Sequence, residues 1–213
     1  MTVDFDNVRH LTLQGQNVVR LDMGGSPVWK GLPDGYKMLD YIEATGTQYI
    51  DTGFVPNQDS RIVCEFMYKG GDGIYGTRTS TASNNFALRV INSAWQPGYS
   101  VLGATGIPSD QKDWHIADQN KNVFSIDGEV GREFEYVTFK APKSIALGGI
   151  NAGNKFYYGQ GRYRSCQIYD NGVLVRDFIP CKNADGEIGM YDTVNAVFYG
   201  NAGTEQFVSG AEV

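Results

Sequence analysis

Residue types that could carry out catalysis are few in this sequence, and they lie far apart. Glu133 and Glu135 come closest to a catalytic pair, because alternate residues of a strand point to the same face. Paired carboxylates can act as the acid and the nucleophile of glycoside hydrolysis. No third acid accompanies these two, and the charges around them are of mixed sign, which is typical of a solvated strand. His10 and His115 are isolated, and no serine or cysteine has the neighbours of a nucleophile. The sequence therefore predicts no catalytic residue.

Acidic side chains near turns could instead hold calcium, which prefers carboxylate and carbonyl oxygens. The aspartates near predicted turns are Asp51, Asp59, Asp72 and Asp127. None belongs to a D-x-D-x-D-G loop, and the glycines on both sides of Asp72 are typical of an ordinary turn. We expect these carboxylates to cap turns, with calcium at Asp51, Asp72 or Asp127 as the alternative. No other cofactor is indicated.

Aromatic and polar side chains in predicted loops could bind a sugar, since flat rings stack on the apolar face of a pyranose and polar groups bond its hydroxyls. The ligand-binding residues that we select are Trp95, Tyr99, Arg78, Asn84, Tyr157, Tyr158 and Arg162. Trp95 stands in a polar, proline-flanked loop, and its alternative place is the core or a subunit contact. Tyr157 and Tyr158 point to opposite sides of a strand, so one is expected in the core and the other available. Trp114 alternates with Ile116 and is expected in the core.

Composition limits the classes of partner and compartment. The net charge is −6 without a basic stripe, which disfavours nucleic acid. No run of about 18 apolar residues is present to span a membrane. The polar, acidic start of the chain does not match a secretory signal, so we expect synthesis in a cytosol. The three cysteines have no CxxC spacing and are expected as buried free thiols.

The elements that must position these residues are short strands. Asn171-Gly172, between two extended arms, is the strongest hairpin signal, because both residues tolerate the positive φ of a type I′ turn. The chain has 27 glycines, 13 tyrosines and 11 phenylalanines but no helical stripe. Turn signals recur about every 8–12 residues, the spacing of a sandwich or barrel. Strands are predicted at 36–43, 47–52, 60–68, 73–78, 84–91, 98–103, 113–118, 121–127, 133–139, 144–150, 161–169, 173–179, 187–192, 196–199 and 205–208.

Residues 1–31 are predicted to form a separate small module. The pattern Val8-x-x-Leu11-x-Leu13-x-Gly15-x-x-Val18 recurs as Val18-x-x-Leu21-x-Met23-x-Gly25-x-x-Val28. Apolar residues two apart before a glycine describe a strand and its reversal, so we expect a β-meander. Such a meander is marginal alone and must pack on the main domain, on copies of itself or on a partner. Its expected anchoring residues are Leu11, Leu13, Leu21, Met23 and Trp29. A glycine- and proline-containing break follows, and the main domain is expected to take residues 36–213.

Several segments of the main domain resemble a known family. Tyr41-Ile42-Glu43-Ala44-Thr45-Gly46-Thr47-Gln48-Tyr49-Ile50-Asp51-Thr52-Gly53 resembles the opening strands of concanavalin A-like, laminin-G-like domains of phages and prophages. Trp114-His115 with Phe124-Ser125-Ile126-Asp127-Gly128 resembles their central strand pair. The run IYDNGVLVRDFIP, with Gly189-Met190-Tyr191-Asp192 and residues 198–204, resembles their C-terminal signature. This resemblance covers about residues 36–209 and implies an all-β, concanavalin A-like jelly-roll β-sandwich.

The N-terminal repeat, which ends in Val28-Trp29-Lys30, resembles short modules of phage tail, baseplate and other virion appendage proteins. Together the two resemblances imply a bacteriophage virion protein, displayed on the particle surface and assembled in the host cytoplasm without a signal peptide. Residues 1–31 would attach it to other virion proteins. Glycosidases that resemble the main domain carry an ExDxxE run, which this sequence lacks.

The function hypothesis is a non-enzymatic virion protein whose laminin-G-like sandwich adheres to host cell-surface or mucus glycans. Single-site sugar binding is weak, so we expect several copies acting together, and the habit of phage fibres predicts a homotrimer. Two alternatives stay open. The protein could be a capsid decoration or tail-appendage protein with a purely structural, particle-stabilising role, or a glycoside hydrolase, which the missing acids disfavour.

Overall fold

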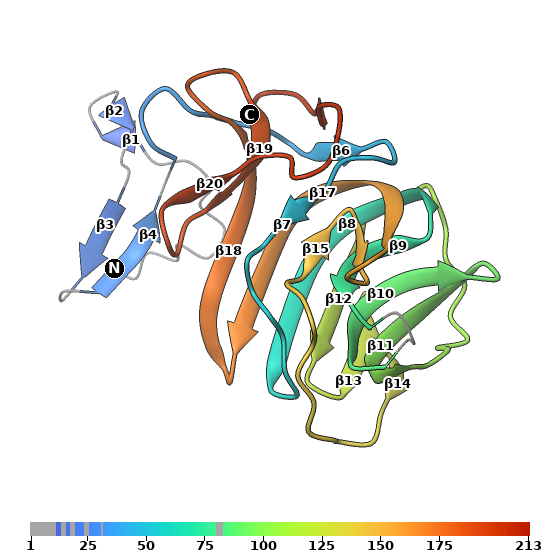
Figure 1. The fold of residues 1–213 in the computed structure, drawn as a ribbon. Helices are drawn as coiled ribbons and strands as arrows, with labels where there is room; N and C mark the ends of the chain where they lie inside the picture. Colours follow the sequence, from blue (N-terminus) through green and yellow to red (C-terminus); the bar gives the residue numbers. More distant parts are fainter. Residues whose placement is uncertain (1–11, 14–15, 18–19, 24–25, 31, 80–82) are drawn as a thin grey trace.

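The computed structural model describes residues 12–13, 16–17, 20–23, 26–30, 32–79 and 83–213 (Figure 1). These residues form strands, turns and bends, and no helix is found among them. The all-β fold class predicted from the glycine and aromatic content is confirmed. It follows that the described residues contain no helix of the length and apolarity needed to cross a membrane.

The described residues between 32 and 213 form two sheets that pack face to face. The larger one, sheet I, is built around two long neighbouring strands, β8 (Ser60–Gly71) and β17 (Phe156–Asp170). From β8 the sheet continues through β12 (His115–Asn120), β13 (Val123–Ile126) and β14 (Glu129–Glu133). From β17 it continues through β18 (Val173–Lys182), β19 (Ile188–Asp192) and β20 (Val197–Tyr199). The short strands that complete it are β6 (Ile42–Ala44), β21 (Val208–Ser209) and β5 (Lys37–Met38).

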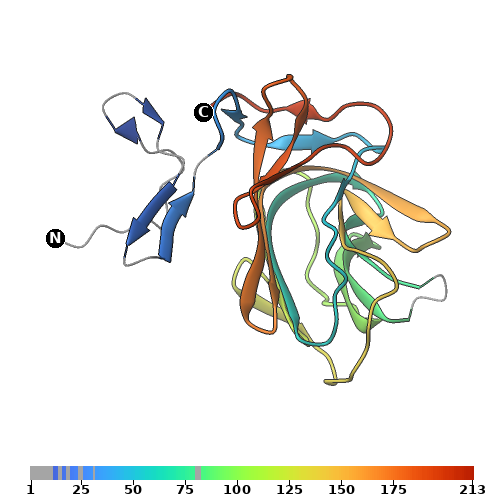
Figure 2. The same cartoon turned by 60° about the vertical axis from the view of Figure 1, so that its left-hand side comes forward.

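The second sheet, sheet II, lies against sheet I and shares β17 with it (Figure 2). Its strands are β11 (Ala94–Leu102), β10 (Asn85–Ile91), β9 (Gly73–Thr77), β15 (Ala146–Leu147), β7 (Ile50–Asp51) and β16 (Gly149–Asn151). β16 pairs antiparallel with the first residues of β17 and, at a single point, parallel with β9, where Asn151 lies beside Thr77. One strand therefore carries the chain from sheet II into sheet I.

The predicted Asn-Gly hairpin is present between β17 and β18. Asp170 pairs with Val173, and the two residues between them, Asn171 and Gly172, have φ values of 48° and 82°. Both values are positive, as a type I′ turn requires. The register of the two strands is therefore set by local turn chemistry, and the prediction is confirmed.

The apolar faces of the two sheets enclose one core. Cys64 and Cys166 lie opposite each other on β8 and β17, fully buried on the inner face of sheet I. Tyr75 of sheet II faces them, and burial, followed by the nearby Cys64 and Cys166, raises its pKa well above 10.0. All three cysteines are buried and free, as predicted from their spacing. The core therefore forms without a disulfide.

The crossing of β17 between the sheets depends on glycine. Gly159 donates its N–H to the carbonyl of Gly148 at 2.9 Å. A Cβ on Gly159 would lie 1.8 Å from the carbonyl oxygen of Gly73, far inside contact distance. Only a residue without a side chain lets β17 and β9 approach this closely.

The described residues between 12 and 30 form two separate two-stranded antiparallel hairpins, whereas a single meander was expected. β1 (Thr12–Leu13) pairs with β2 (Gln16–Asn17), and β3 (Arg20–Met23) pairs with β4 (Ser26–Lys30). Four of the predicted anchoring residues fall in these strands, namely Leu13, Leu21, Met23 and Trp29. Leu11 lies outside the described residues. The anchoring role of all five stays a prediction.

Candidate functional site

The β16–β17 hairpin brings together more of the predicted ligand-binding residues than any other part of the described chain. Its turn is closed by bonds from Ala152 N to the carbonyl of Lys155, at 2.9 Å, and from Asn154 N to the carbonyl of Ala152, at 3.1 Å. Gly153 supplies the positive φ, 80°, that the turn requires. The yellow-orange hairpin stands at the right-hand edge of Figure 2. A tight turn of this kind holds the side chains that follow it in fixed register.

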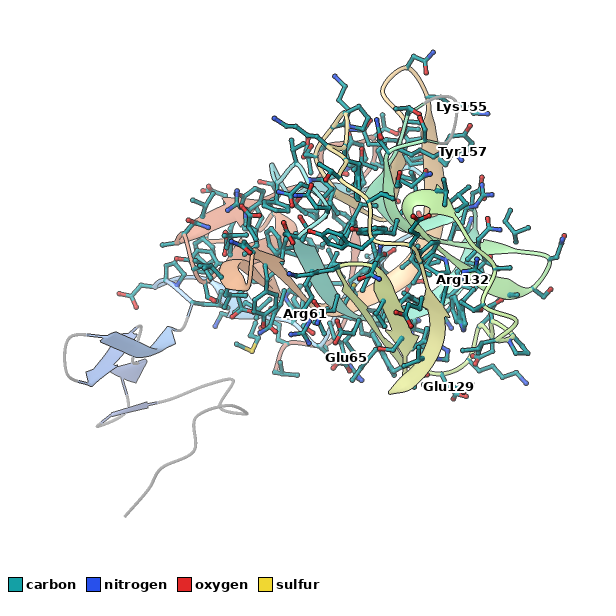
Figure 3. The ribbon with its side chains drawn as sticks, turned by 90° about the horizontal axis from the view of Figure 1, so that it is seen from below. Arg61, Glu65, Glu129, Arg132, Lys155 and Tyr157 are labelled. Atoms are coloured by element: carbon teal, nitrogen blue, oxygen red, sulfur yellow. The ribbon has the colours of Figure 1, made fainter. Side chains whose placement is uncertain are left out.

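One face of the hairpin carries an aromatic ring in contact with two cations. The Cζ atom of Arg78 lies 4.1 Å from the centre of the Tyr157 ring, and Nζ of Lys155 lies 4.6 Å from it. Figure 3 shows Lys155 beside Tyr157 at this end of the molecule. The N–H of Arg78 donates to the carbonyl of Asn151 at 3.0 Å, which ties the end of β9 to β16. Two residues selected from separate predicted loops, Arg78 and Tyr157, are therefore in direct contact.

The opposite face of the same strand carries a group of three aromatic rings, which we call the aromatic group. The rings of Tyr49 and Phe156 are 4.2 Å apart, and those of Phe156 and Tyr158 are 4.5 Å apart. Tyr158 is 37% exposed. Phe156 and Tyr158 share this face because side chains alternate along a strand, and Tyr157 points the other way. Neither Tyr157 nor Tyr158 lies in the core, so the expectation that one of them would be buried there is wrong.

The cations beside Tyr157 are crowded. Burial lowers the pKa of Arg89 on β10, and the positive charge of Arg78 lowers it further, while Asp72 opposes the shift. Nε of Arg89 donates to Oε1 of Gln96 at 2.6 Å. The side chain of Arg78 is 6% exposed, and its Nε has no hydrogen-bond partner among the described residues. This end of sheet II therefore concentrates positive charge that the described part of the protein does not neutralise by direct pairing.

Trp95 does not lie in an exposed loop, and that prediction is wrong. It belongs to β11, is 1% exposed and packs edge-on against Phe66, Tyr68 and His115, with ring centres 5.6, 6.0 and 5.1 Å away. The alternative, a place in the core, is the correct one. On the edge of β11 away from β10, the irregular segment 103–109 bonds to Trp95 through its N–H and carbonyl but to Pro97 only through its carbonyl, so the ring of Pro97 costs no ladder hydrogen bond there.

Tyr99 is also a core residue, and its selection as a ligand-binding residue is corrected. It is fully buried on β11, and its hydroxyl donates to the carbonyl of Gln58 at 3.1 Å. Burial raises its pKa to about 12. Tyr99 and Trp95 lie on the same face of β11, and this face is turned toward sheet I.

Asn84 and Arg162 lie apart from the Tyr157 contact. Asn84 precedes β10 with a φ of 50°, a turn position that asparagine tolerates. Arg162 belongs to sheet I, where its Nε donates to Oε2 of Glu43 at 2.7 Å and its Cζ lies 4.5 Å from the Tyr41 ring centre.

A second aromatic surface lies on the outer face of sheet I and was missed from the sequence. Trp114 is half-buried rather than in the core, so its predicted place is wrong. The Cζ atom of Arg164 lies 3.8 Å from its ring centre, and the Tyr41 ring is 6.0 Å away. Ile116, which has the same parity, is 50% exposed. The inward residues of β12 are instead His115, Ala117 and Gln119, and no apolar alternation in the sequence marks this parity as the buried one.

The cations of this second surface are already paired. Arg164 donates to both carboxylate oxygens of Asp40, at 3.1 and 3.2 Å, and lies 3.5 Å from Glu65. Arg61, also on this face, pairs with Asp118 at 2.7 Å. Figure 3 shows Arg61 and Glu65 well apart from Lys155 and Tyr157. The second surface is therefore internally neutralised, unlike the hairpin.

The predicted calcium ligands take part in turns. Oδ1 of Asp51 accepts from the N–H of Gly53 at 3.0 Å. Oδ1 of Asp127 accepts from the N–H of Ile116 at 2.8 Å, and its Oδ2 lies 2.7 Å from Nδ1 of His115. The N–H of Asp72 donates to the carbonyl of Tyr158 at 3.0 Å. Within the described ranges, no three acidic, histidine or cysteine side chains converge on a point suited to a metal ion.

The residues considered for catalysis do not converge either. Glu133 and Glu135 are both exposed. His115 is 7% exposed, and its two ring nitrogens lie 2.7 Å from Asp127 and 3.1 Å from Asp110. An imidazole held between two carboxylates fixes the loop before β12 to the turn after β13, rather than facing a substrate.

The hairpin therefore combines a partly exposed aromatic group on one face with a ring and unpaired cations on the other. Aromatic rings and cations arranged in this way are groups that can stack on and bind a ligand. No protein-family model matches the chain, and no curated protein matches it significantly.

Proposed function

We propose that this protein is a non-enzymatic bacteriophage virion protein whose β-sandwich adheres to host cell-surface or mucus glycans through the β16–β17 hairpin. The observation that carries the proposal is the aromatic group, in which Tyr158 is 37% exposed beside Phe156 and Tyr49. Rings held on a strand offer a sugar a flat, apolar surface at little cost in side-chain entropy.

The rigidity of the site supports recognition. Tyr49 is held by its backbone, because its N–H donates to Oδ1 of Asn201 at 3.0 Å and its carbonyl accepts from Ala202 N at 2.9 Å. Phe156 and Tyr158 are held by pairing with Asn151 and Gly149. A pre-ordered surface loses little freedom on binding.

Several copies on one particle make weak contacts useful. A single stacked sugar gives modest affinity, and linking several sites raises the effective concentration of the second and third contacts. We propose that residues 1–31 attach the protein to other virion proteins and that the protein is a homotrimer. Immunogold labelling of purified particles tests the virion location, and absence of label overturns it.

A glycan array probed with the full-length chain tests adhesion. Tyr158→Ala should weaken binding about fivefold per site, the equivalent of about 1 kcal/mol for one stacking contact. The matched control is Tyr136→Ala, which removes a tyrosine that is 51% exposed and bonded to Asp59 away from the hairpin. Silence of the wild-type chain on every glycan, or an equal loss in the control, contradicts the proposal.

A structural, particle-stabilising role is the second candidate. It is favoured by exposed apolar side chains on the outer face of sheet I, where Ile116 is 50% exposed and Val130 is 63% exposed. Both share a face because Val130 pairs with Ser125, which in turn pairs with Asp118, two residues after Ile116. Particles that lack the protein should then lose infectivity at a lower temperature than complete particles.

A further inference from the structure

We infer that the β16–β17 hairpin binds an acidic group, a sugar carboxylate or sulfate, through Arg78, Arg89 and Lys155, so that the glycan recognised is anionic. The inference rests on the proposed function, because it names the chemical class of the glycan. It is carried by observations other than the aromatic group, on which the proposed function depends.

The first observation is the gathering of positive charge in an acidic protein. The chain has a net charge of −6. Arg78 and Lys155 nevertheless contact the same tyrosine ring, at 4.1 and 4.6 Å. Arg89 lies close enough to Arg78 for the two charges to oppose each other. Cε of Lys143 lies 3.9 Å from the position that a Cβ would take on Gly153 in the hairpin turn. Like charges held together favour an anion between them.

The second observation is the lack of carboxylate partners. Arginines that are partly buried on sheet I each pair with an acid: Arg61 with Asp118, Arg162 with Glu43, Arg164 with Asp40 and Arg176 with Asp192. Arg78, Arg89 and Lys155 form no ion pair within the part of the chain that the structure describes. Asp72 is the acid that acts on Arg89, and it does so without a direct salt bridge. Among the described residues, therefore, no carboxylate lies within ion-pair distance of this cluster.

The third observation is the state of Arg78 itself. Its side chain is 6% exposed, and its buried Nε has no acceptor among the described residues. A buried charged donor without a partner is costly unless something compensates it. The face of Tyr157 supplies part of that compensation through its quadrupole. A bound carboxylate or sulfate would supply the rest, since a guanidinium offers a planar fork that matches such anions.

Because its side chain is exposed whereas that of Arg78 is buried, Lys155 is the residue of this cluster that an approaching ligand can reach from solvent. It is exposed at the end of the turn, immediately before Phe156 of the aromatic group. A polymer that crosses the hairpin can place one sugar on Tyr158 and the acidic group of a neighbouring sugar near Lys155 and Tyr157. One face of β17 would then bind a sugar ring of the polymer, and the other face would bind the acidic group of the neighbouring sugar.

Binding of the full-length protein to two matched polymer pairs tests the inference. Polygalacturonate is compared with its carboxyl-reduced neutral form, and dextran sulfate with dextran, by biolayer interferometry. We expect at least one acidic polymer to bind about tenfold more tightly than its neutral partner, and Lys155→Gln to remove most of that difference. The pair that shows the larger difference identifies carboxylate or sulfate. Arg78→Met, checked for a native circular dichroism spectrum, should do the same.

The control is Lys182→Gln, which removes one positive charge from β18, where Lys182 pairs with exposed Glu212 at 3.2 Å. Its binding should stay within about twofold of wild type. Equal binding of acidic and neutral polymers, equal losses in the two lysine variants, or no binding to any of the four polymers overturns the inference. The glycan array with Tyr158→Ala decides the proposed function independently, because neutral glycans that bind there would uphold adhesion while the acidic preference fails.

Discussion

Replacing Trp95 tests whether this residue belongs to the core of the protein or contributes to the proposed binding surface. The side chain is 1% exposed and in edge contact with three other rings. A buried tryptophan removes about 150–250 Å² from water. At about 25 cal/mol per Å² this area corresponds to about 4–6 kcal/mol, an upper estimate because the unfolded chain is partly compact. Trp95→Ala should therefore lower the free energy of unfolding by about 4 kcal/mol, within the range measured for such truncations.

Urea unfolding followed by far-ultraviolet circular dichroism measures this loss, and Trp95→Phe gives a milder test. Phenylalanine keeps one ring against Phe66 and should cost about 1–2 kcal/mol. Polymer binding by Trp95→Phe should match wild type, since the residue does not reach the surface. Tyr136→Ala, at an exposed position, should change stability by about 0.5 kcal/mol. A Trp95→Ala loss below about 1 kcal/mol, or a folded Trp95→Phe that no longer binds, refutes the burial argument.

Three further predictions concern the same fold. Gly159→Ala places a Cβ 1.8 Å from the Gly73 carbonyl oxygen and should lower the free energy of unfolding by about 3 kcal/mol or more. Gly128→Ala, with φ 83° and no atom within 4 Å of its Cβ, should lower it by about 1 kcal/mol. Urea unfolding of the two variants compares these losses. Tyr163→Phe removes the hydroxyl that donates to the Ile74 carbonyl at 2.9 Å and should cost about 1–2 kcal/mol; unchanged stability would contradict that bond. Burial raises the pKa of Cys181 from 9.0 to about 12 and that of Tyr99 from 10.0 to about 12, so the folded state keeps protons that the unfolded chain releases. The free energy of unfolding should stay at its neutral value below pH 9 and fall between pH 9 and about 12, and Cys181→Val should reduce that fall.

Features set by neighbouring residues were predictable from the sequence. The Asn171-Gly172 turn follows from the positive φ that both residues accept, and it is found with both angles positive. The cysteines were correctly placed as buried thiols because Cys64 shares its parity with Ile62 and Phe66 on β8. The turn and the burial of Cys64 both follow from the residues next to them in the sequence, so they could be predicted without knowing which strands pair.

Features set by the pairing of distant strands were not predictable. Trp95 looked like a loop residue because a proline follows it, but the actual reversal is at Asn92 and Ser93, which have φ values of 49° and 57°. The contact of Arg78 with Tyr157 depends on the parallel register of Asn151 with Thr77, which no local pattern encodes. Trp114, which directly precedes β12, was assigned to the core because it alternates with Ile116, but the side chains of β12 that face the core are those of His115, Ala117 and Gln119. Sequence reasoning selected both Arg78 and Tyr157 but could not tell that the two side chains would meet.

The passage of β17 through both sheets means that the tip of the β16–β17 hairpin and the centre of the molecule are one uninterrupted piece of backbone. Its first residues hold the hairpin against β16, and its later residues lie between β8 and β18. Free energy gained when the tip is occupied is thereby added to the stability of the central strand, so an occupied protein should resist unfolding as a whole rather than only at its edge.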